Sequence, residues 1–276
     1  MGSLQSLTYI NELMSKHNLS FKKSLGQNFL IDKNALERII LEADLNSEDI
    51  VLEIGPGIGT LTRALAAKAK KVYAVEIDQR LMPALAETLA GYSNVSVINN
   101  DILELDLSFL RNKQLKIVAN LPYYITTPII YHLLEQDLDI EKMVFLVQKE
   151  VAQRFIADIG TKHYGTTSVT LQAYADVNLA FVVKPVCFIP QPNVESAVIS
   201  IVPKSNIDYD VNLLQRVVKK AFLQRRKKII NALSAKGDLE YSKEQWSRIL
   251  AKSAIVEDKR PDSISVEEYL RIVLNI

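Results

Sequence analysis

The sequence predicts an α/β fold built on a mostly parallel sheet, followed by a small all-helical domain at its C-terminal end. Three observations lead to this prediction. Short apolar runs alternate with amphipathic helical patterns over residues 31–147, the alternation stops after Val147, and the pattern is helical from about Asn206 onward. Strands that alternate with helices are typical of a parallel sheet with helices on both faces.

The first half of the chain supplies the elements of the parallel sheet. A helix over Ile31–Ala43 precedes the first strand. The predicted strands are short, apolar and rich in β-branched residues, and they cover Ile50–Ile54, Lys71–Ile77, Val95–Ile98, Leu115–Ala119 and Met143–Val147. The helical patterns between them cover Leu61–Ala69, Leu81–Leu89 and Ile129–Leu134.

The second half has a different pattern. Strands are predicted over Ser168–Ala175, Leu179–Val183 and Ala197–Val202, and the short link Asp176–Asn178 suggests an antiparallel hairpin. Helices are predicted over Val211–Leu223, Ile229–Leu233, Lys243–Lys252 and Val266–Val273. We therefore predict one domain over residues 1–205, with an N-terminal helical extension, and a helical domain over residues 206–276.

Composition excludes several classes of protein. With 276 residues, of which 48% are hydrophobic, the chain is long enough for one large domain and one small domain. No apolar run approaches the roughly 18 residues of a membrane span, and the N-terminus lacks the pattern of a signal peptide. One cysteine and three scattered histidines form no metal-ligand cluster, so no metal is expected. We expect a monomeric, cytoplasmic protein.

A glycine-rich turn indicates a nucleoside cofactor. The stretch IVLEIGPGIGTLTRAL predicts a strand, a turn and a helix, with Gly55, Gly57 and Gly59 in the turn. Glycines there let the backbone approach a ligand closely and adopt dihedrals that other residues disfavour. A hydride-transfer fingerprint, G-x-G-x-x-G, would need a glycine where the chain has Thr60. The observed spacing favours a cofactor without a pyrophosphate.

Two acidic residues follow at the ends of the next two predicted strands. Glu76 lies 21 residues after Gly55, where a carboxylate can accept hydrogen bonds from both hydroxyls of a ribose. Asp101 follows the third strand, where a carboxylate can accept a hydrogen bond from an adenine amine. Each acid alone could instead cap the helix that follows it. Together with the glycine turn, they predict S-adenosylmethionine as the cofactor.

The stretch NLPY ends the fourth predicted strand. Asn120, Leu121, Pro122 and Tyr123 resemble the (N/D)-P-P-(Y/F) motif of amino-methyltransferases that act on adenine, with Leu121 in place of the first proline. The Asn120 side-chain oxygen and a backbone carbonyl near Leu121 can accept the two amine hydrogens and stabilise the charge that develops on the nitrogen. Pro122 stiffens the turn, and Tyr123 offers a face on which the base can stack. The alternative is an ordinary turn at a strand end, but beside the glycine turn we predict these four residues as catalytic.

Basic residues concentrate toward the C-terminal end, although the net charge is only +1. Residues 1–110 hold 10 Lys or Arg against 14 Asp or Glu, whereas residues 184–276 hold 16 against 11. Within Arg216–Lys228, seven of thirteen residues are basic and none is acidic. In a single helix, five of the seven would share an arc of about 120°: Arg216, Lys219, Lys220, Arg226 and Lys227.

A break near Gln224 is possible, because Arg225 and Lys228 do not fit that arc. A basic face is often only solvated surface. Beside an adenine-binding motif, however, contact with phosphates is favoured. We predict that Arg225, Arg226, Lys227 and Lys228 bind RNA.

Taken together, these motifs resemble those of the KsgA-type ribosomal RNA adenine N6,N6-dimethyltransferases. The matching pieces cover nearly the whole chain: SLGQNFLID (24–32), EIGPGIGTLT (53–62), VEID (75–78), NND (99–101), NLPYYITTPII (120–130), QKEVAQRF (148–155), YGTTSV (164–169), FIPQPNVESAV (188–198) and AFLQRRKKIINAL (221–233). The resemblance implies a Rossmann-like S-adenosylmethionine-dependent methyltransferase domain that transfers four methyl groups to two adjacent adenosines near the 3′ end of small-subunit rRNA. It also implies a role in late assembly of the small ribosomal subunit, and cofactor contacts from Asn28 and Leu30 beside Gly55, Glu76, Asp101 and Asn120.

Two stretches depart from the family's pattern, and two other functions stay open. YGTTSV replaces a more usual YG-x-L-S-V, and KRPDSIS replaces an R-A-E-x-L-S type; both lie away from the predicted chemistry. An Erm-type enzyme would instead modify one adenine of large-subunit rRNA, although the tail RPDSISVEEYLRI is more similar to the KsgA type. A nonenzymatic RNA-binding assembly factor would keep the fold without the reaction, which the intact Glu76, Asn120 and Tyr123 argue against.

Overall fold

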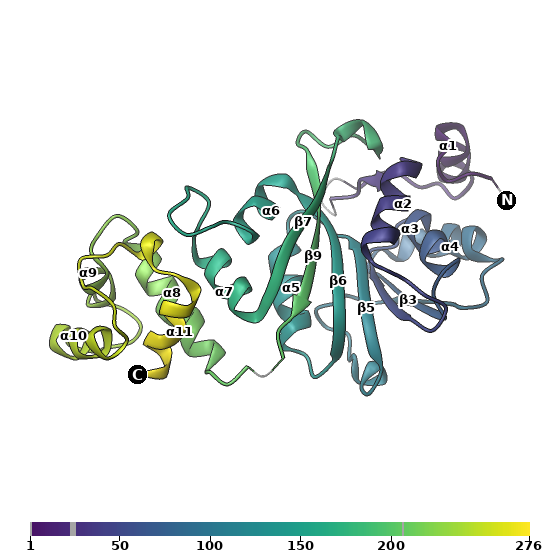
Figure 1. The fold of residues 1–276 in the computed structure, drawn as a ribbon. Coiled ribbons are helices and arrows are strands. Elements are labelled where there is room, and N and C mark those ends of the chain that lie inside the picture. Colours follow the sequence, from purple (N-terminus) through teal and green to yellow (C-terminus); the bar gives the residue numbers. More distant parts are fainter. Residues whose placement is uncertain (1, 23–25, 206) are drawn as a thin grey trace. The chain divides into compact units, whose positions relative to one another are not determined.

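The computed structural model describes residues 2–22, 26–205 and 207–276 (Figure 1). Contacts divide the chain into two units. The sheet unit comprises Met1–Ala152 and Asn178–Pro203, and the helical unit comprises Gln153–Val177 and Lys204–Ile276. The helical unit thus also takes in a segment that the sequence assigned to the first domain. The division at 205/206 stays a prediction, and Asn206 lies outside the described residues, as do Ser24 and Leu25 of the first matching piece.

A seven-stranded sheet forms the core of the sheet unit. Its strands are β2 (Ile50–Ile54), β3 (Lys71–Glu76), β4 (Val95–Asn99), β5 (Gln114–Asn120), β6 (Asp139–Gln148), β7 (Ala175–Val183) and β9 (Ser196–Pro203). They lie in the order β4-β3-β2-β5-β6-β9-β7. Strands β2 to β6 are parallel to one another, and β9 is antiparallel to β6. The mostly parallel sheet predicted from the alternating pattern is confirmed.

The register brings four strand ends to one edge of this sheet. Ile54, the last residue of β2, pairs with Val75 on one side and with Ala119 on the other. Glu76 pairs with Asn99. Because parallel strands end at the same edge, the glycine turn after β2 lies beside the ends of β3 and β5.

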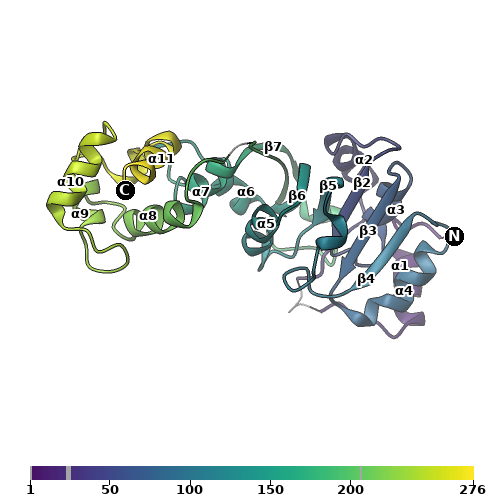
Figure 2. The ribbon, with the colours of Figure 1, turned by 90° about the horizontal axis from the view of Figure 1, so that it is seen from below.

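Six helices accompany the strands before β7. They are α1 (Leu7–Lys16), α2 (Lys33–Glu42), α3 (Thr60–Ala66), α4 (Met82–Leu89), α5 (Thr126–Glu135) and α6 (Lys149–Phe155). The Asp32 side chain caps α2 by accepting a hydrogen bond from the Ala35 backbone N–H, at 2.7 Å. Figure 2 shows β4 at the border of the sheet, next to α4. Four predicted helices are confirmed as α2 to α5, whereas α1 and α6 were not predicted.

A buried layer joins two of these helices to the sheet. Leu36 and Ile39 of α2 and Leu65 of α3 pack with Val118 of β5 and Val144 of β6. All five side chains are almost fully buried. The same cluster includes Leu30 of a two-stranded antiparallel sheet, in which β1 (Phe29–Leu30) pairs with β8 (Phe188–Ile189). This small sheet was not predicted.

Short 3₁₀ turns complete the connections. They cover Gln79–Leu81, Ser108–Leu110, Pro185–Cys187 and Pro261–Ser263. Among the described residues, no helix is both long enough and apolar enough to cross a membrane.

The prediction of a strand over Ser168–Ala175 is wrong. Thr166–Tyr174 form a helix, α7, and the adjoining Asp176–Asn178 lie inside β7 instead of linking a hairpin. The helix begins where the Ser168 hydroxyl accepts a hydrogen bond from the Gly165 N–H, at 3.1 Å. Its β-branched residues favour strands locally, but α7 is buried on several sides, and tertiary packing overrides that weak preference.

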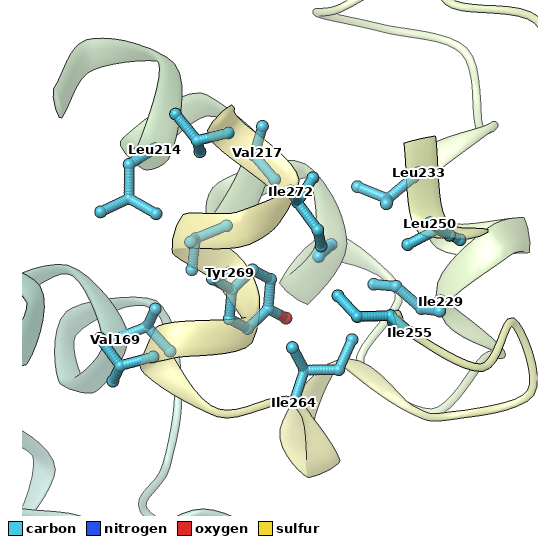
Figure 3. Packing of buried hydrophobic residues seen from close by; sticks show 14 of the residues in the cluster. Val169, Leu214, Val217, Ile229, Leu233, Leu250, Ile255, Ile264, Tyr269 and Ile272 are labelled. Carbon is cyan, nitrogen blue, oxygen red and sulfur yellow. The ribbon is translucent and has the colours of Figure 1, made fainter. Parts of the chain in front are cut away.

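The helical unit has its own apolar core, shown in Figure 3. Its remaining helices are α8 (Val211–Leu223), α9 (Ile229–Leu233), α10 (Lys243–Lys252) and α11 (Val266–Leu274), which confirm the four predicted helices. Val169 of α7, Leu214 of α8 and Ile272 of α11 belong to one cluster. Trp246 of α10 is fully buried in the same cluster and packs edge-on against Tyr241.

We expect Ile272→Ala to destabilise the helical unit by about 2–5 kcal/mol, because it removes a fully buried side chain and leaves a cavity. Urea unfolding followed by the fluorescence of Trp246, the one tryptophan of the chain, reports on this core. Leu274→Ala is the matched control on the same helix, since Leu274 is 61% exposed. Equal effects of the two substitutions would contradict the packing described.

Candidate active site

A pocket lies at the edge of the sheet where β2, β3 and β5 end. It is lined by the turn after β2, the ends of the neighbouring strands and the segment 26–30. The structure brings most of the predicted site residues together here: Asn28, Leu30, Gly55, Gly57, Glu76, Asp101, Asn120, Leu121, Pro122 and Tyr123. Gly59, the N-cap residue of α3, does not line the pocket.

Backbone geometry explains the glycines of the turn. Gly55, Gly57 and Gly59 have φ angles of +71°, +61° and +90°, in the region that side chains disfavour. A Cβ atom on Gly57 would also lie 2.8 Å from the Phe29 ring. The close approach of Phe29 and the turn therefore requires glycine at this position.

Glu76 presents a buried carboxylate to the pocket. One oxygen accepts a hydrogen bond from the Gly57 N–H at 3.0 Å, and the other accepts one from the Asp78 N–H at 2.8 Å. Burial raises the pKa of Glu76 to about 7, against the lowering effect of these hydrogen bonds. Each oxygen keeps a second lone pair with which to accept a hydroxyl donor.

Glu53 is a pocket residue that the sequence analysis missed. It lies on β2, is almost fully buried, and has one carboxyl oxygen with no hydrogen-bond partner. Burial, with a smaller contribution from the nearby Glu76, raises the pKa of Glu53 to about 8. An acidic residue inside an otherwise apolar strand was the available signal.

The other predicted acid has a local partner as well. The Asp101 side chain lines the pocket and accepts a hydrogen bond from the Leu103 N–H at 2.9 Å. This hydrogen bond closes the turn after β4 and uses only one of the two carboxylate oxygens of Asp101.

Asn120 is oriented by segment 26–30, which lines the pocket. Its side-chain nitrogen donates to the Asn28 carbonyl at 2.8 Å, so its side-chain oxygen is left as the acceptor. The Leu121 N–H donates to the Leu146 carbonyl of β6 at 3.1 Å, and the Pro122 carbonyl accepts from the Thr126 hydroxyl at 3.1 Å. Both bonds fix the turn in which Asn120 lies.

A hydrogen bond to the buried Asp78 fastens segment 26–30 to the region just after β3. The Gln27 amide donates to Asp78 at 2.8 Å, and Asp78 pairs with Arg80 at 2.6 Å. The hydrogen bond from Arg80 is the main reason that the pKa of Asp78 is lowered. Asp78 and Arg80 were not singled out from the sequence, and they hold the segment that orients Asn120.

Tyr123 is anchored from a second strand. Its hydroxyl lies 2.6 Å from the hydroxyl of Ser196, the first residue of β9, and Tyr123 lines the pocket. Burial raises the pKa of Tyr123.

The four predicted RNA-binding residues lie in the helical unit and differ in their surroundings. Helix α8 ends at Leu223, so the basic run is broken near Gln224. Arg225 pairs with Asp262 at 3.1 Å and donates to the carbonyls of Thr161 and Lys162, each at 2.9 Å. Lys228 pairs with Asp258 at 2.8 Å. Arg226 and Lys227 are exposed, and their side chains have no recorded partner among the described residues.

The single-helix basic arc considered for this run does not form. Lys220 is buried, and its amine donates to the Ala235 carbonyl at 2.6 Å. Arg216 pairs with Asp238. These two cations therefore serve contacts within the helical unit.

The pocket fits a cationic nucleoside. The Glu76 carboxylate suits the two hydroxyls of a ribose. One oxygen of the buried Glu53 has no hydrogen-bond partner and could accept a hydrogen bond from a ligand. Within the described ranges, no group of His, Cys, Asp or Glu is arranged to hold a metal ion.

Comparison with known proteins gives the chain's relatives. The family described as "Ribosomal RNA adenine dimethylase" matches residues 18–272. Ribosomal RNA small subunit methyltransferase A of Alkaliphilus metalliredigens is 45% identical over 285 residues, covering 100% of this chain and 99% of that protein. Its counterpart in Bacillus mycoides is 47% identical over 268 residues, covering 94% and 92%.

Solved structures agree on the fold. The 23S rRNA methyltransferase ErmE is 27% identical, with a TM-score of 0.71, and the match covers 90% of this chain and 99% of that chain. A dimethyladenosine transferase from Plasmodium falciparum is 24% identical, with a TM-score of 0.79, and covers 89% and 96%. The predicted Rossmann-like methyltransferase fold with a C-terminal helical region is confirmed.

We expect the affinity for S-adenosylmethionine to rise with pH through about 7, the pKa of Glu76 in the free protein. Ribose hydroxyls donate to the carboxylate form, so binding favours loss of the proton, and a group that titrates near 7 gives about a tenfold gain between pH 6 and pH 8. Calorimetry across this range measures it.

Glu76→Gln should flatten this profile, and Glu76→Ala should weaken binding by about tenfold or more, because two charge-assisted hydrogen bonds are lost. Glu53→Gln is the control for the neighbouring acid. A profile that Glu76→Gln leaves unchanged, or unaltered affinity in Glu76→Ala, would remove Glu76 from the cofactor site.

Proposed function

The chain belongs to the ribosomal RNA adenine dimethylase family, and we propose that it transfers methyl groups from S-adenosylmethionine to the N6 amines of two adjacent adenosines near the 3′ end of small-subunit rRNA. The observation that carries this proposal is the orientation of Asn120. Its amide nitrogen is engaged by the Asn28 carbonyl, so its oxygen is free to accept a hydrogen bond from an adenine amine.

S-adenosylmethionine would supply, when bound, a methyl group on a sulfonium sulfur, and the neutral thioether S-adenosylhomocysteine would be the leaving group and product. The task of the protein is then positioning and electrostatic stabilisation. An adenine amine is a weak nucleophile because its lone pair is delocalised into the ring. The Asn120 oxygen and the Leu121 carbonyl accept its two hydrogens, and both stabilise the positive charge that develops on the nitrogen. No strong base is needed, because the cationic nitrogen formed by methyl transfer is acidic and releases its proton to water.

Other residues hold the reactants. Glu76 would accept hydrogen bonds from the ribose hydroxyls of the cofactor, and Asp101 would accept one from its adenine amine. Gly55 and Gly57 would let the backbone approach the cofactor. Asn28 and Leu30, in segment 26–30, close the pocket on another side. The ring of Tyr123 stacks on the target base, a contact worth about 1–3 kcal/mol.

Two alternatives make different predictions. The likeness in fold to ErmE keeps an Erm-type reaction on large-subunit rRNA in view, but the relatives at 45% and 47% identity over nearly the full chain are small-subunit enzymes. A nonenzymatic assembly factor would bind the cofactor without transferring a methyl group. We favour a monomeric enzyme that works in the cytoplasm on immature small subunits, where ribosomal RNA is accessible during assembly.

An in vitro assay separates these functions. The protein is incubated with labelled S-adenosylmethionine and either immature small subunits or naked large-subunit RNA. The proposal predicts dimethyladenosine in the small-subunit RNA. Label in the large-subunit RNA would support the Erm-type reaction, and cofactor binding without label in either would support an assembly factor.

We expect Asn120→Ala to lower methyl transfer by about 10²–10³-fold while RNA binding stays nearly intact. The Asn120 oxygen gains most when charge builds on the nitrogen, so its loss falls on the transition state. Single-turnover assays at saturating cofactor and RNA measure the rate. Transfer within a few-fold of wild type would mean that Asn120 only ends a strand.

We also expect the basic run to contribute to RNA affinity through phosphate contacts. Replacing Arg225, Arg226, Lys227 and Lys228 together by Ala should weaken RNA binding and reduce its salt dependence. Each lost phosphate contact lowers the slope of log affinity against log salt by about 0.7–0.9. Cofactor affinity should not change, because the run lies in the helical unit.

Two double variants divide this effect. Arg226→Ala with Lys227→Ala should account for most of the change in slope, since these side chains are exposed. Arg225→Ala with Lys228→Ala should mainly lower the stability of the helical unit, since both side chains are held by acids. An unchanged slope in the quadruple variant would show that the run is only solvated surface.

A further inference from the structure

Tyr123 and Ser196 are far apart in the sequence and meet at the pocket. Tyr123 follows β5, whereas Ser196 begins β9. Their hydroxyl oxygens are 2.6 Å apart, at the short end of the range for hydrogen bonds between hydroxyls. Ser196 is fully buried, while Tyr123 is partly exposed and lines the pocket.

The position of Ser196 is fixed by the sheet. It pairs with Gln148, the last residue of β6, in an antiparallel register. The preceding residue, Glu195, accepts a hydrogen bond from the Lys149 N–H at 3.0 Å through its carbonyl, and its carboxylate pairs with the Lys149 amine at 2.7 Å. The end of β6 and the start of β9 are therefore joined next to Ser196, which fixes the backbone that carries its hydroxyl.

This anchor restricts the tyrosine ring. A side chain attached only at its Cβ can populate several rotamers. With its hydroxyl bound to Ser196, Tyr123 is held at both ends of the ring axis. The face that a base would stack on is thus set before the base arrives, which lowers the entropic cost of forming the stack.

We propose that Ser196 is a positioning residue for the target adenine, because its hydroxyl holds the Tyr123 ring in the orientation on which the base stacks. This inference rests on the proposed function. Ser196 does not touch the reacting atoms and acts through Tyr123. If the bond merely satisfied two hydroxyls, its loss would change stability and leave methyl transfer as it was.

A double-mutant cycle tests the proposal. Ser196→Ala, Tyr123→Phe and the double variant are compared with wild type for kcat/KM toward immature small subunits, for S-adenosylmethionine affinity and for thermal stability. Ser200→Ala is the matched control, because Ser200 is a buried serine on the same strand that pairs with Val144 instead of Gln148.

Each single variant should lower kcat/KM by about tenfold, in keeping with the loss of one buried hydrogen bond. The double variant should be no more than about twofold worse than either, because both substitutions remove the same interaction. Cofactor affinity and the Ser200→Ala variant should stay within about twofold of wild type. Tyr123→Ala should be worse than Tyr123→Phe, since it also removes the ring.

The proposal is overturned if Ser196→Ala keeps wild-type kcat/KM or if the two effects multiply in the double variant. Should Ser196→Ala fail to fold, Tyr123→Phe decides alone, because it removes the same bond from the partly exposed partner. Failure of the proposed function is seen separately, as wild-type protein that does not methylate adenine in small-subunit RNA.

Discussion

The hydrogen bond from the Asn120 amide to the Asn28 carbonyl joins two segments that are 92 residues apart in the sequence. An asparagine amide carries both a donor and an acceptor, so its chemical use depends on which end is already engaged. Here the donor end is engaged by the protein, and in the proposed reaction the acceptor end receives the target amine. The segment that provides the carbonyl is itself held through Gln27 and Asp78 at the end of β3. Segment 26–30 therefore connects Asp78, which follows the predicted cofactor residue Glu76, to Asn120, the proposed acceptor of the target amine.

The electrostatics of the pocket, like its geometry, favour a cationic cofactor. Glu53 and Glu76 are two buried acids in one pocket, and burial raises the pKa of each. Ionising these buried carboxyl groups is costly in the empty pocket, and a bound cation makes their charged form favourable. A sulfonium cofactor with an ammonium group supplies that cation. The same pocket would be a poor host for a pyrophosphate, in agreement with the absence of the hydride-transfer glycine spacing.

The sequence predicted the parallel part of the fold well, because β2, β3, β5 and β6 each contain a run of buried apolar residues, and turns with glycine or polar residues separate the strands. It also predicted Glu76 and Asn120, since a polar side chain directly after an apolar strand is visible without coordinates. It failed at α7, where β-branched residues favour a strand and packing on several sides imposes a helix. It could not find Ser196, because only the antiparallel pairing of β9 with β6 brings that hydroxyl to Tyr123. The pairing of Arg225 with Asp262 could not be predicted either, because the two residues lie far apart in the sequence and only the packing of the helical unit brings them together.

The most direct test of the account is a map of dimethyladenosine in the rRNA of cells with and without this gene, made by mass spectrometry of RNA fragments. We predict that two adjacent dimethyladenosines near the 3′ end of the small-subunit rRNA disappear when the gene is deleted and return when it is restored. Small-subunit rRNA with unchanged methylation, or a loss confined to the large-subunit rRNA, would contradict the account.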